Sequence, residues 1–285
     1  MLGVLKRYLI ILGLLLALIY PIDRLCHFLT DGFYEHRIVT NLPNRDDWEV
    51  NVLPPKEALS QNYHYLGCGG QSFVFESEDH QFVLKFFKHH RWKKDRYLFR
   101  LQNMEERVEC REQTLMSAVY ALQFCQNESR VEYAHLNRGT SDLPVVTFID
   151  RVRRKHRLDL NQYQFIIQRK GITLQERLVS RKARGDLEGA KEDVRSSLEL
   201  LAYCHHKGIK NKDPYMPRNF GFVDDKPVVI DSGALCPYPE NRPQKIPEKD
   251  LRKAVARLLQ WTDKNYPPLS HEIHEWIKLY LSDTP

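Results

Sequence analysis

Two short stretches of the chain carry residue types that could hold a phosphate group. The first, residues 67–74, reads GCGGQSFV, with Gly67 and Gly69 between two predicted strands. Glycine lets backbone N–H groups approach a phosphate closely and tolerates positive φ. Ser72 stands where a third glycine would complete G-x-G-x-x-G, and Val74 follows on the next strand. A glycine-rich turn alone is a weak signal, so a purely structural turn is the alternative interpretation.

The second stretch, residues 82–87, reads FVLKFF and encloses Lys85 between apolar side chains. Burying an unpaired ammonium group is costly. The lysine therefore either reaches solvent from an edge strand or is held by a carboxylate and contacts phosphates. Its position eleven residues after Val74, on the strand that follows the glycine-rich turn, favours the phosphate contact.

A third stretch completes an ordered set of motifs. Residues 203–219 read YCHHKGIKNKDPYMPRN, and residues 228–233 read VVIDSG after a predicted hairpin. Together with the first two stretches, this order resembles the protein-kinase-like superfamily over about residues 60–262. Asp213 stands at the aspartate of the H-R-D motif, and Asp231 stands at the aspartate of D-F-G.

The resemblance implies a role for each polar residue. Asp231 and Asn219 would supply oxygen ligands for Mg²⁺, and Asp213 would accept or orient the proton of the attacking hydroxyl. Lys85 would hold the α- and β-phosphates of ATP, paired with a carboxylate on a long helix, for which Glu112 is the first choice. Glu109 and Glu105 remain alternatives. Around the nucleotide, the resemblance places these residues of the glycine-rich turn: Gly67, Gly69, Ser72 and Val74.

The sequence also departs from the kinase pattern. Asn211 and Ser232 replace the histidine of H-R-D and the phenylalanine of D-F-G, and the interval from Asp213 to Asn219 is one residue longer than usual. Only 54 residues follow Asp231 in this sequence, which leaves little room for an activation segment and peptide-docking helices. The build is similar to that of short lipopolysaccharide kinases and other small-substrate kinases, or to that of a related pseudokinase.

The hydrophobic pattern predicts the elements that must position these residues. Short apolar runs predict strands before residue 170, among them residues 63–66, 72–75 and 82–87. One long helix is predicted over residues 97–126, and the pattern becomes mostly helical after Gly171. The expected fold is α+β: a two-lobed protein-kinase-like fold with an N-lobe over residues 61–170 and a truncated C-lobe over residues 171–285.

The first 22 residues predict a membrane anchor. Residues 8–22 read YLIILGLLLALIYPI without a charge, and the apolar reach of about 20 residues suits a bilayer span. A cleaved signal peptide or a buried helix are the alternatives, although no small-x-small cleavage site follows. Lys6 and Arg7 favour a cytoplasmic N-terminus of a single-pass protein, with the side of the kinase-like domain left open. Residues 23–60 read as a polar connector.

Composition excludes several classes of protein. The chain has 285 residues, 28% of them charged and 42% hydrophobic, which excludes disordered, collagen-like and coiled-coil proteins. A net charge of +6 is modest at this length, so no nucleic acid partner is expected. The sequence therefore predicts a membrane-anchored phosphotransferase that uses ATP and Mg²⁺ to phosphorylate a hydroxyl on a glycan, lipid or similar acceptor. The alternative is a catalytically inactive pseudokinase that acts as a membrane-tethered binding or scaffolding module.

Overall fold

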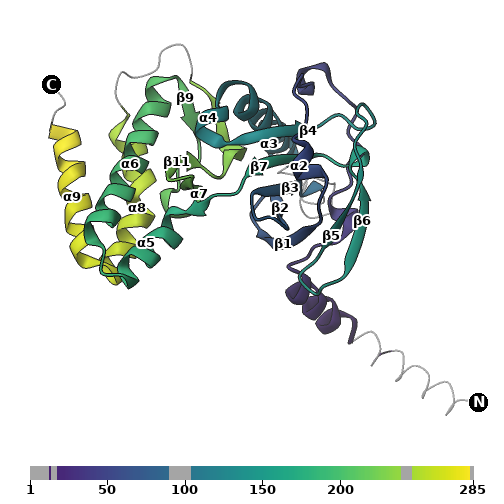
Figure 1. Cartoon of the computed structure of the whole chain (residues 1–285), viewed down its shortest axis with the longest axis horizontal. Helices are drawn as coiled ribbons and strands as arrows, with labels where there is room; N and C mark the ends of the chain where they lie inside the picture. The colour runs from purple at the N-terminus through teal and green to yellow at the C-terminus, as the bar shows by residue number, and fades with distance from the viewer. Residues whose placement is uncertain (1–12, 14–17, 90–103, 239–245, 283–285) are drawn as a thin grey trace, which may run out of the picture.

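The computed structural model describes residues 13, 18–89, 104–238 and 246–282. Most strands and one long helix gather in one half of the molecule, and the other long helices lie in the other half (Figure 1). A curled sheet of seven strands runs in the order β4-β7-β3-β2-β1-β5-β6. Its strands are β1 (Tyr63–Cys68), β2 (Ser72–Ser77), β3 (Phe82–Phe87), β4 (Val131–His135), β5 (Val145–Ile149), β6 (Lys155–Asp159) and β7 (Phe165–Arg169).

Strand β3 lies in the interior of this sheet, which explains its unbroken apolar sequence. It pairs with β2 on one side and β7 on the other, with Lys85 opposite Val74 and Ile166. All six residues of β3 are buried, because both faces of the sheet are covered. Phe87 belongs to the core cluster shared with helix α3 (Met104–Phe124), whereas Phe86 belongs to a second cluster on the opposite face.

That second cluster includes part of the segment expected to be a polar connector. Phe33, Ile38 and Ala58 are buried against the aromatic side chains of the sheet. The ring of Phe33 meets the ring of Phe75 edge-on, with 5.0 Å between centroids. Phe33, Ile38 and Ala58 therefore cover one face of the sheet, whereas Trp48 of the same segment is buried in the first cluster, which contains residues of α3. The sequence did not reveal this because the buried residues are too widely spaced to form a periodic pattern.

The other half of the molecule is built from helices and two small sheets. Its long helices are α5 (Leu174–Ala183), α6 (Leu187–His206), α8 (Glu248–Asn265) and α9 (Pro267–Ser282). The short strands are β8 (Ile172–Thr173), β9 (Ile209–Asn211), β10 (Phe220–Val223), β11 (Lys226–Val229) and β12 (Leu235–Pro237). The short helical segments among the described residues include η1 (Glu35–Arg37), η2 (Asp46–Trp48), α2 (Lys56–Leu59), α4 (Gln126–Ser129), η5 (Leu160–Gln162), α7 (Met216–Asn219) and η6 (Ser232–Ala234).

Local signals explain where these helices begin and how they are joined. Thr173 caps α5 through a reciprocal capping box with Glu176, whose carboxylate accepts from the Thr173 N–H at 2.9 Å. Asp193 on α6, only 3% exposed, accepts from Nε of Arg177 at 2.8 Å and from Nε of Arg181 at 2.9 Å. This buried ion-pair network fixes α5 against α6.

One glycine allows the two halves to meet closely. Gly221 on β10 pairs with β8, and a Cβ at this position would lie 2.3 Å from the Ile172 carbonyl oxygen. No larger residue fits there unless β8 moves. Strand β8 follows β7, the last strand of the large sheet, and β10 belongs to the hairpin that precedes Asp231. The pairing of β8 with β10 therefore holds these two segments directly against each other.

The predicted membrane-spanning helix over residues 1–22 is wrong. In the part of the chain that the structure describes, no helix is both long enough and apolar enough to cross a bilayer. Residues 18–30 form a helix in which Asp23 and Arg24 directly follow the apolar run. Residues 1–12 and 14–17, which make up most of the predicted span, lie outside the described residues. The prediction of a single-pass membrane localisation is wrong with it.

Candidate functional site

A cleft of about 750 Å³ opens between the seven-stranded sheet and the helical half. From the sheet it is lined by the β1–β2 turn, by Lys85 and by the end of β7. From the helical half it is lined by Asn219, Ile230 and Asp231. The residues that the sequence singled out therefore border one cavity, with two exceptions. Asp213 does not line the cleft but contacts Asn219, which does, and Glu112 does not line it either.

The glycine-rich turn forms one wall of the cleft. Gly67 lies opposite Val74 in the antiparallel register of β1 and β2, and the Gly69 N–H donates to the Ser72 carbonyl at 3.0 Å. Neither glycine has a positive φ, and a Cβ at either position would meet no atom within 4 Å. Packing and backbone geometry thus do not require glycine here. Because glycine has no side chain, Gly67 and Gly69 leave the backbone of the turn open toward the cleft.

Lys85 is buried at the inner end of the cleft. Its side chain is 9% exposed, and its Nζ donates to the Ile230 carbonyl oxygen at 2.7 Å. Burial lowers the pKa of Lys85, and the nearby carboxylate of Asp231 partly opposes that change. The ammonium group is thus held beside Asp231 by the chain segment that precedes it.

The structure does not bring Glu112 to Lys85. Glu112 lies on a half-exposed face of α3, where its carboxylate forms an ion pair with Arg45 at 3.3 Å. A small cavity of about 40 Å³ beside Lys85 is instead lined from α3 by Thr114 and Ala118. Of the alternatives, Glu109 is exposed and accepts from Gln113, and the side chain of Glu105 lies outside the described residues.

Asn219 joins the two aspartates. Its carbonyl oxygen accepts from the N–H groups of Ile230 at 2.7 Å and Asp231 at 3.3 Å. Its side-chain Nδ2 donates to the backbone oxygen of Asp213 at 2.9 Å and to Oδ2 of Asp213 at 3.2 Å. One buried asparagine therefore sets the positions of both acids, one through its backbone and the other through its amide.

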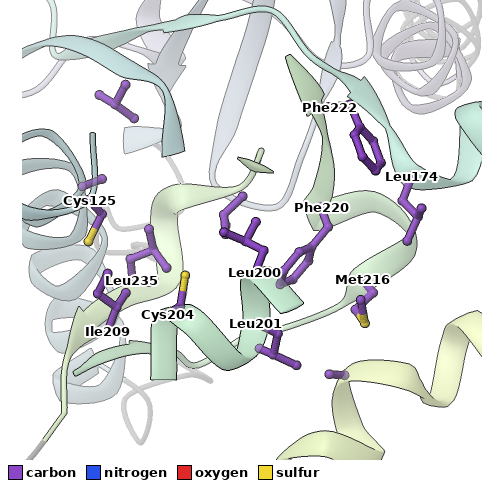
Figure 2. Packing of buried hydrophobic residues seen from close by; sticks show 14 of the residues in the cluster. Cys125, Leu174, Leu200, Leu201, Cys204, Ile209, Met216, Phe220, Phe222 and Leu235 are labelled. Atoms are coloured by element: carbon purple, nitrogen blue, oxygen red, sulfur yellow. The ribbon is translucent and has the colours of Figure 1, made fainter. Parts of the chain in front are cut away.

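The extra residue between Asp213 and Asn219 is absorbed by a single helical turn. Helix α7, Met216–Asn219, occupies this interval, with Pro217 at its start. Met216 and Phe220 flank the turn and are both buried. Figure 2 shows them in the same interior as Leu200 and Leu201 of α6, so the loop is anchored by apolar packing on both sides of Asn219.

The donor set suits a magnesium ion bound together with phosphates. Because Nδ2 of Asn219 is used in hydrogen bonds to Asp213, its Oδ1 is the atom left to bind a cation. Asp231 is exposed toward the cleft, and its carboxylate accepts the Gly233 N–H at 3.2 Å. No cluster of three or more His, Cys, Asp or Glu side chains suited to a metal occurs among the described residues. Mg²⁺ commonly binds through one or two carboxylates plus substrate phosphates, so two protein donors suffice.

Sequence reasoning missed six polar residues of the cleft: Gln168, Arg169, Lys170, Thr173, Glu176 and Arg218. The position of Arg218 directly before Asn219 was a signal that could have identified it. Gln168 and Lys170 line the opposite wall at the end of β7, where Lys170 forms an ion pair with Glu76. Nothing in the sequence marks the latter two, because their position depends on where β7 ends relative to the helical half.

Comparison with known proteins gives only a weak likeness. No protein-family model and no curated protein matches the chain. Among solved structures, a medium-resolution structure of the bifunctional kinase-methyltransferase WbdD is similar, with a TM-score of 0.40 and 15% identity over 70% of this chain and 37% of that one. A high-resolution structure of WbdD has a TM-score of 0.40 and 16% identity over 70% and 36%. This chain thus spans little more than a third of the WbdD length.

Proposed function

We propose that this chain is a kinase-like phosphotransferase that moves the γ-phosphate of ATP to a hydroxyl group of a small acceptor. One observation carries the proposal: the hydrogen bonds of Asn219 that hold Asp213 and Asp231 together at the cleft. Residues 61–170 act as the N-lobe and residues 171–285 as a short C-lobe. The nucleotide then lies in the 750 Å³ cleft between them.

Each wall of the cleft has a task in this proposal. The open backbone around Gly67, Gly69 and Ser72 approaches the phosphates, and Val74 packs against the nucleotide from the next strand. Lys85 contacts the α- and β-phosphates with its buried ammonium group. Asn219 and Asp231 would hold Mg²⁺, which would supply charge neutralisation for the transferring phosphoryl group.

Asp213 orients the acceptor for transfer. Its carboxylate accepts a hydrogen bond from the acceptor hydroxyl and takes the proton as the acceptor oxygen forms a bond to the γ-phosphorus. The bond between the γ-phosphorus and the bridging oxygen breaks, and ADP leaves with that electron pair. Asp213 then returns the proton to solvent. Because Asp213 is exposed, both the acceptor and water can reach it.

A second candidate function follows from the environment of Lys85. In the described residues its ammonium group has no carboxylate partner on α3, and Glu112 is occupied by Arg45. Active protein kinases need a lysine–glutamate pair in place. This observation favours a pseudokinase that binds nucleotide or another ligand in the cleft without transferring phosphate.

Two variants separate these functions. With the full chain, ATP and Mg²⁺ together are expected to raise the melting temperature, and Asp231→Ala should abolish that shift. Asp213→Ala should retain the shift but lose ATP turnover, which is measured as ADP release. Asp142→Ala, which removes an exposed carboxylate outside the cleft, is the matched control and should change neither result.

The outcomes are distinct. If the parent protein shows no Mg²⁺-dependent shift with ATP, nucleotide binding in the cleft is excluded. If the shift occurs and depends on Asp231, but no acceptor supports ADP release above that of Asp213→Ala, the pseudokinase function holds.

A further inference from the structure

A second buried lysine lies behind the glycine-rich turn. Lys88 directly follows β3 and is only 7% exposed. Its ammonium group lies 4.5 Å from the centre of the ring of Phe73, which is itself buried. The proposed transfer of phosphate does not use this residue. Because a buried ammonium group is costly unless its surroundings compensate it, the contacts of Lys88 indicate what it does.

Lys88 holds the turn at two points. Its Nζ donates to the Gly69 carbonyl oxygen at 2.6 Å, and its backbone N–H donates to the Gln71 carbonyl oxygen at 2.8 Å. These two carbonyls flank Gly70, the residue at the tip of the turn. The hydrogen bond from the ammonium group is charge-assisted, so it is stronger than one between neutral groups. Lys88 therefore fixes the tip of the turn from the end of β3.

These two hydrogen bonds set the direction of N–H groups in the turn. A peptide unit is planar and trans, so its C=O and N–H groups point to opposite sides. Because the carbonyls of Gly69 and Gln71 are held toward Lys88, the N–H groups of the residues that follow them, Gly70 and Ser72, point away from it. Gly70 and Ser72 line the small cavity of about 40 Å³, whereas Lys88 does not. The lysine thus orients the backbone of the turn from outside the cavity.

The small cavity joins the turn to the charged groups of the cleft. Lys85 and Asp231 line both the small cavity and the cleft. The Gln71 side chain packs on Gly233, where an added Cβ would lie 2.8 Å from Oε1 of Gln71. The turn therefore rests on the segment that carries Asp231. Its position determines how closely its backbone approaches a phosphate group that contacts Lys85.

We propose that Lys88 is a positioning residue for nucleotide binding, which holds the glycine-rich turn so that its backbone faces the phosphates beside Lys85. Residues 67, 69 and 70 are all glycine, and glycine loses more conformational freedom on ordering than any other residue. A turn of this composition gains most from a contact that orders it before the ligand binds. The inference rests on the nucleotide binding in the proposed function and does not require phosphate transfer.

Binding measurements on the full-length Lys88→Met variant test this role. Methionine keeps the apolar contact with Phe73 and the backbone N–H that bonds to Gln71, and it removes the ammonium group. Calorimetry measures the affinity for ATP with Mg²⁺, and competition against ATP gives the affinity for adenosine, which has no phosphates. ATP affinity should fall about tenfold, the factor that corresponds to one hydrogen bond from a charged donor. Adenosine affinity should change by less than about twofold, because adenosine does not distinguish an ordered turn from a loose one.

Lys207→Met is the matched control. The Lys207 ammonium group also lies near an aromatic ring, 5.5 Å from the centre of Tyr203, but this lysine is exposed and does not line the cleft. Its replacement should leave both affinities within about twofold of the parent values. A tenfold loss of ATP affinity in both variants would show a general effect of charge and would overturn the assignment to Lys88.

The remaining outcomes are also decisive. If Lys88→Met lowers the affinities for ATP and adenosine equally, or does not fold, the lysine serves the fold of the sheet and the positioning role is overturned. If the variant binds ATP as tightly as the parent, the inference fails while nucleotide binding in the cleft stands. If the parent itself binds no ATP, the proposed function fails and the inference fails with it.

Discussion

Replacing Lys85 by methionine is expected to stabilise the folded protein while weakening nucleotide binding. The Lys85 ammonium is buried, and its one hydrogen bond in the described contacts goes to a neutral carbonyl, that of Ile230. Methionine has a similar length and no charge to desolvate. The two expected effects have opposite signs, which distinguishes a lysine retained for ligand binding from one retained for stability.

The magnitude follows from two competing contributions. The effective penalty for burying an ion is several kcal/mol, and a hydrogen bond from a charged donor recovers about 1.5–3 kcal/mol. Methionine removes both contributions and leaves the Ile230 carbonyl without this donor. We therefore expect the free energy of unfolding to rise by about 1–2 kcal/mol at pH 7.

The increase in the free energy of unfolding caused by Lys85→Met should depend on pH in a defined direction. Burial lowers the pKa of Lys85 in the folded protein below its unfolded value of 10.5. The unfolded chain then binds more protons between these two values, so the wild-type stability rises with pH in that window. Methionine does not titrate. The advantage of Lys85→Met is thus fully present at pH values below the folded pKa and narrows as the pH rises toward 10.5.

Urea denaturation at pH 7 and pH 10 measures both effects, with Lys226→Met as the control. Lys226 is exposed on β11, so its replacement should change stability by less than about 0.5 kcal/mol. A lower free energy of unfolding for Lys85→Met at pH 7 would refute the reasoning, as would a difference that stays constant between the two pH values. The loss of the Mg²⁺-dependent shift with ATP is measured on the same protein.

Two further predictions concern stability and the role of α3. Asp193→Ala should lower the free energy of unfolding, measured by urea denaturation, by about 3 kcal/mol. The variant leaves Arg177 and Arg181 with only their more exposed carboxylate partners. A loss below about 1 kcal/mol would show that the network adds little to stability. Glu112→Gln should leave stability within about 0.5 kcal/mol and ADP release within about twofold, because its exposed ion pair is remote from Lys85. A large drop in ADP release would instead show that Glu112 reaches Lys85 during turnover.

The sequence determined much of the local structure near the cleft. The predicted strands over residues 63–66, 72–75 and 82–87 all lie within β1, β2 and β3, because alternating or continuous apolar runs bounded by glycine specify a strand over a few residues. The order of the motifs also identified side chains that now border one cavity, among them Lys85 and Asp231.

The choice of a partner for Lys85 depends on contacts between distant segments, which the sequence does not show. The apolar spacing of α3 favours Glu112 as that partner. In the structure, the rotation of α3 turns Glu112 toward Arg45 and presents Thr114 to the lysine. Periodicity gives the face of a helix only approximately, because one residue changes the direction of a side chain by about 100°. The start of that helix was predicted at residue 97, which lies outside the described residues.

The sequence alone therefore determined which residues could do chemistry, and only the tertiary structure decided which of them meet. Asn219 contacts Asp213 through its side-chain amide and the Asp231 N–H through its backbone carbonyl. The backbone contact has no signature in the sequence. A cavity of about 360 Å³ beside α7 likewise draws on residues of α5, α7 and α8 that are far apart along the chain. Local interactions specify strands, turns and caps, whereas a site assembled from separate elements is set by how their buried faces pack together.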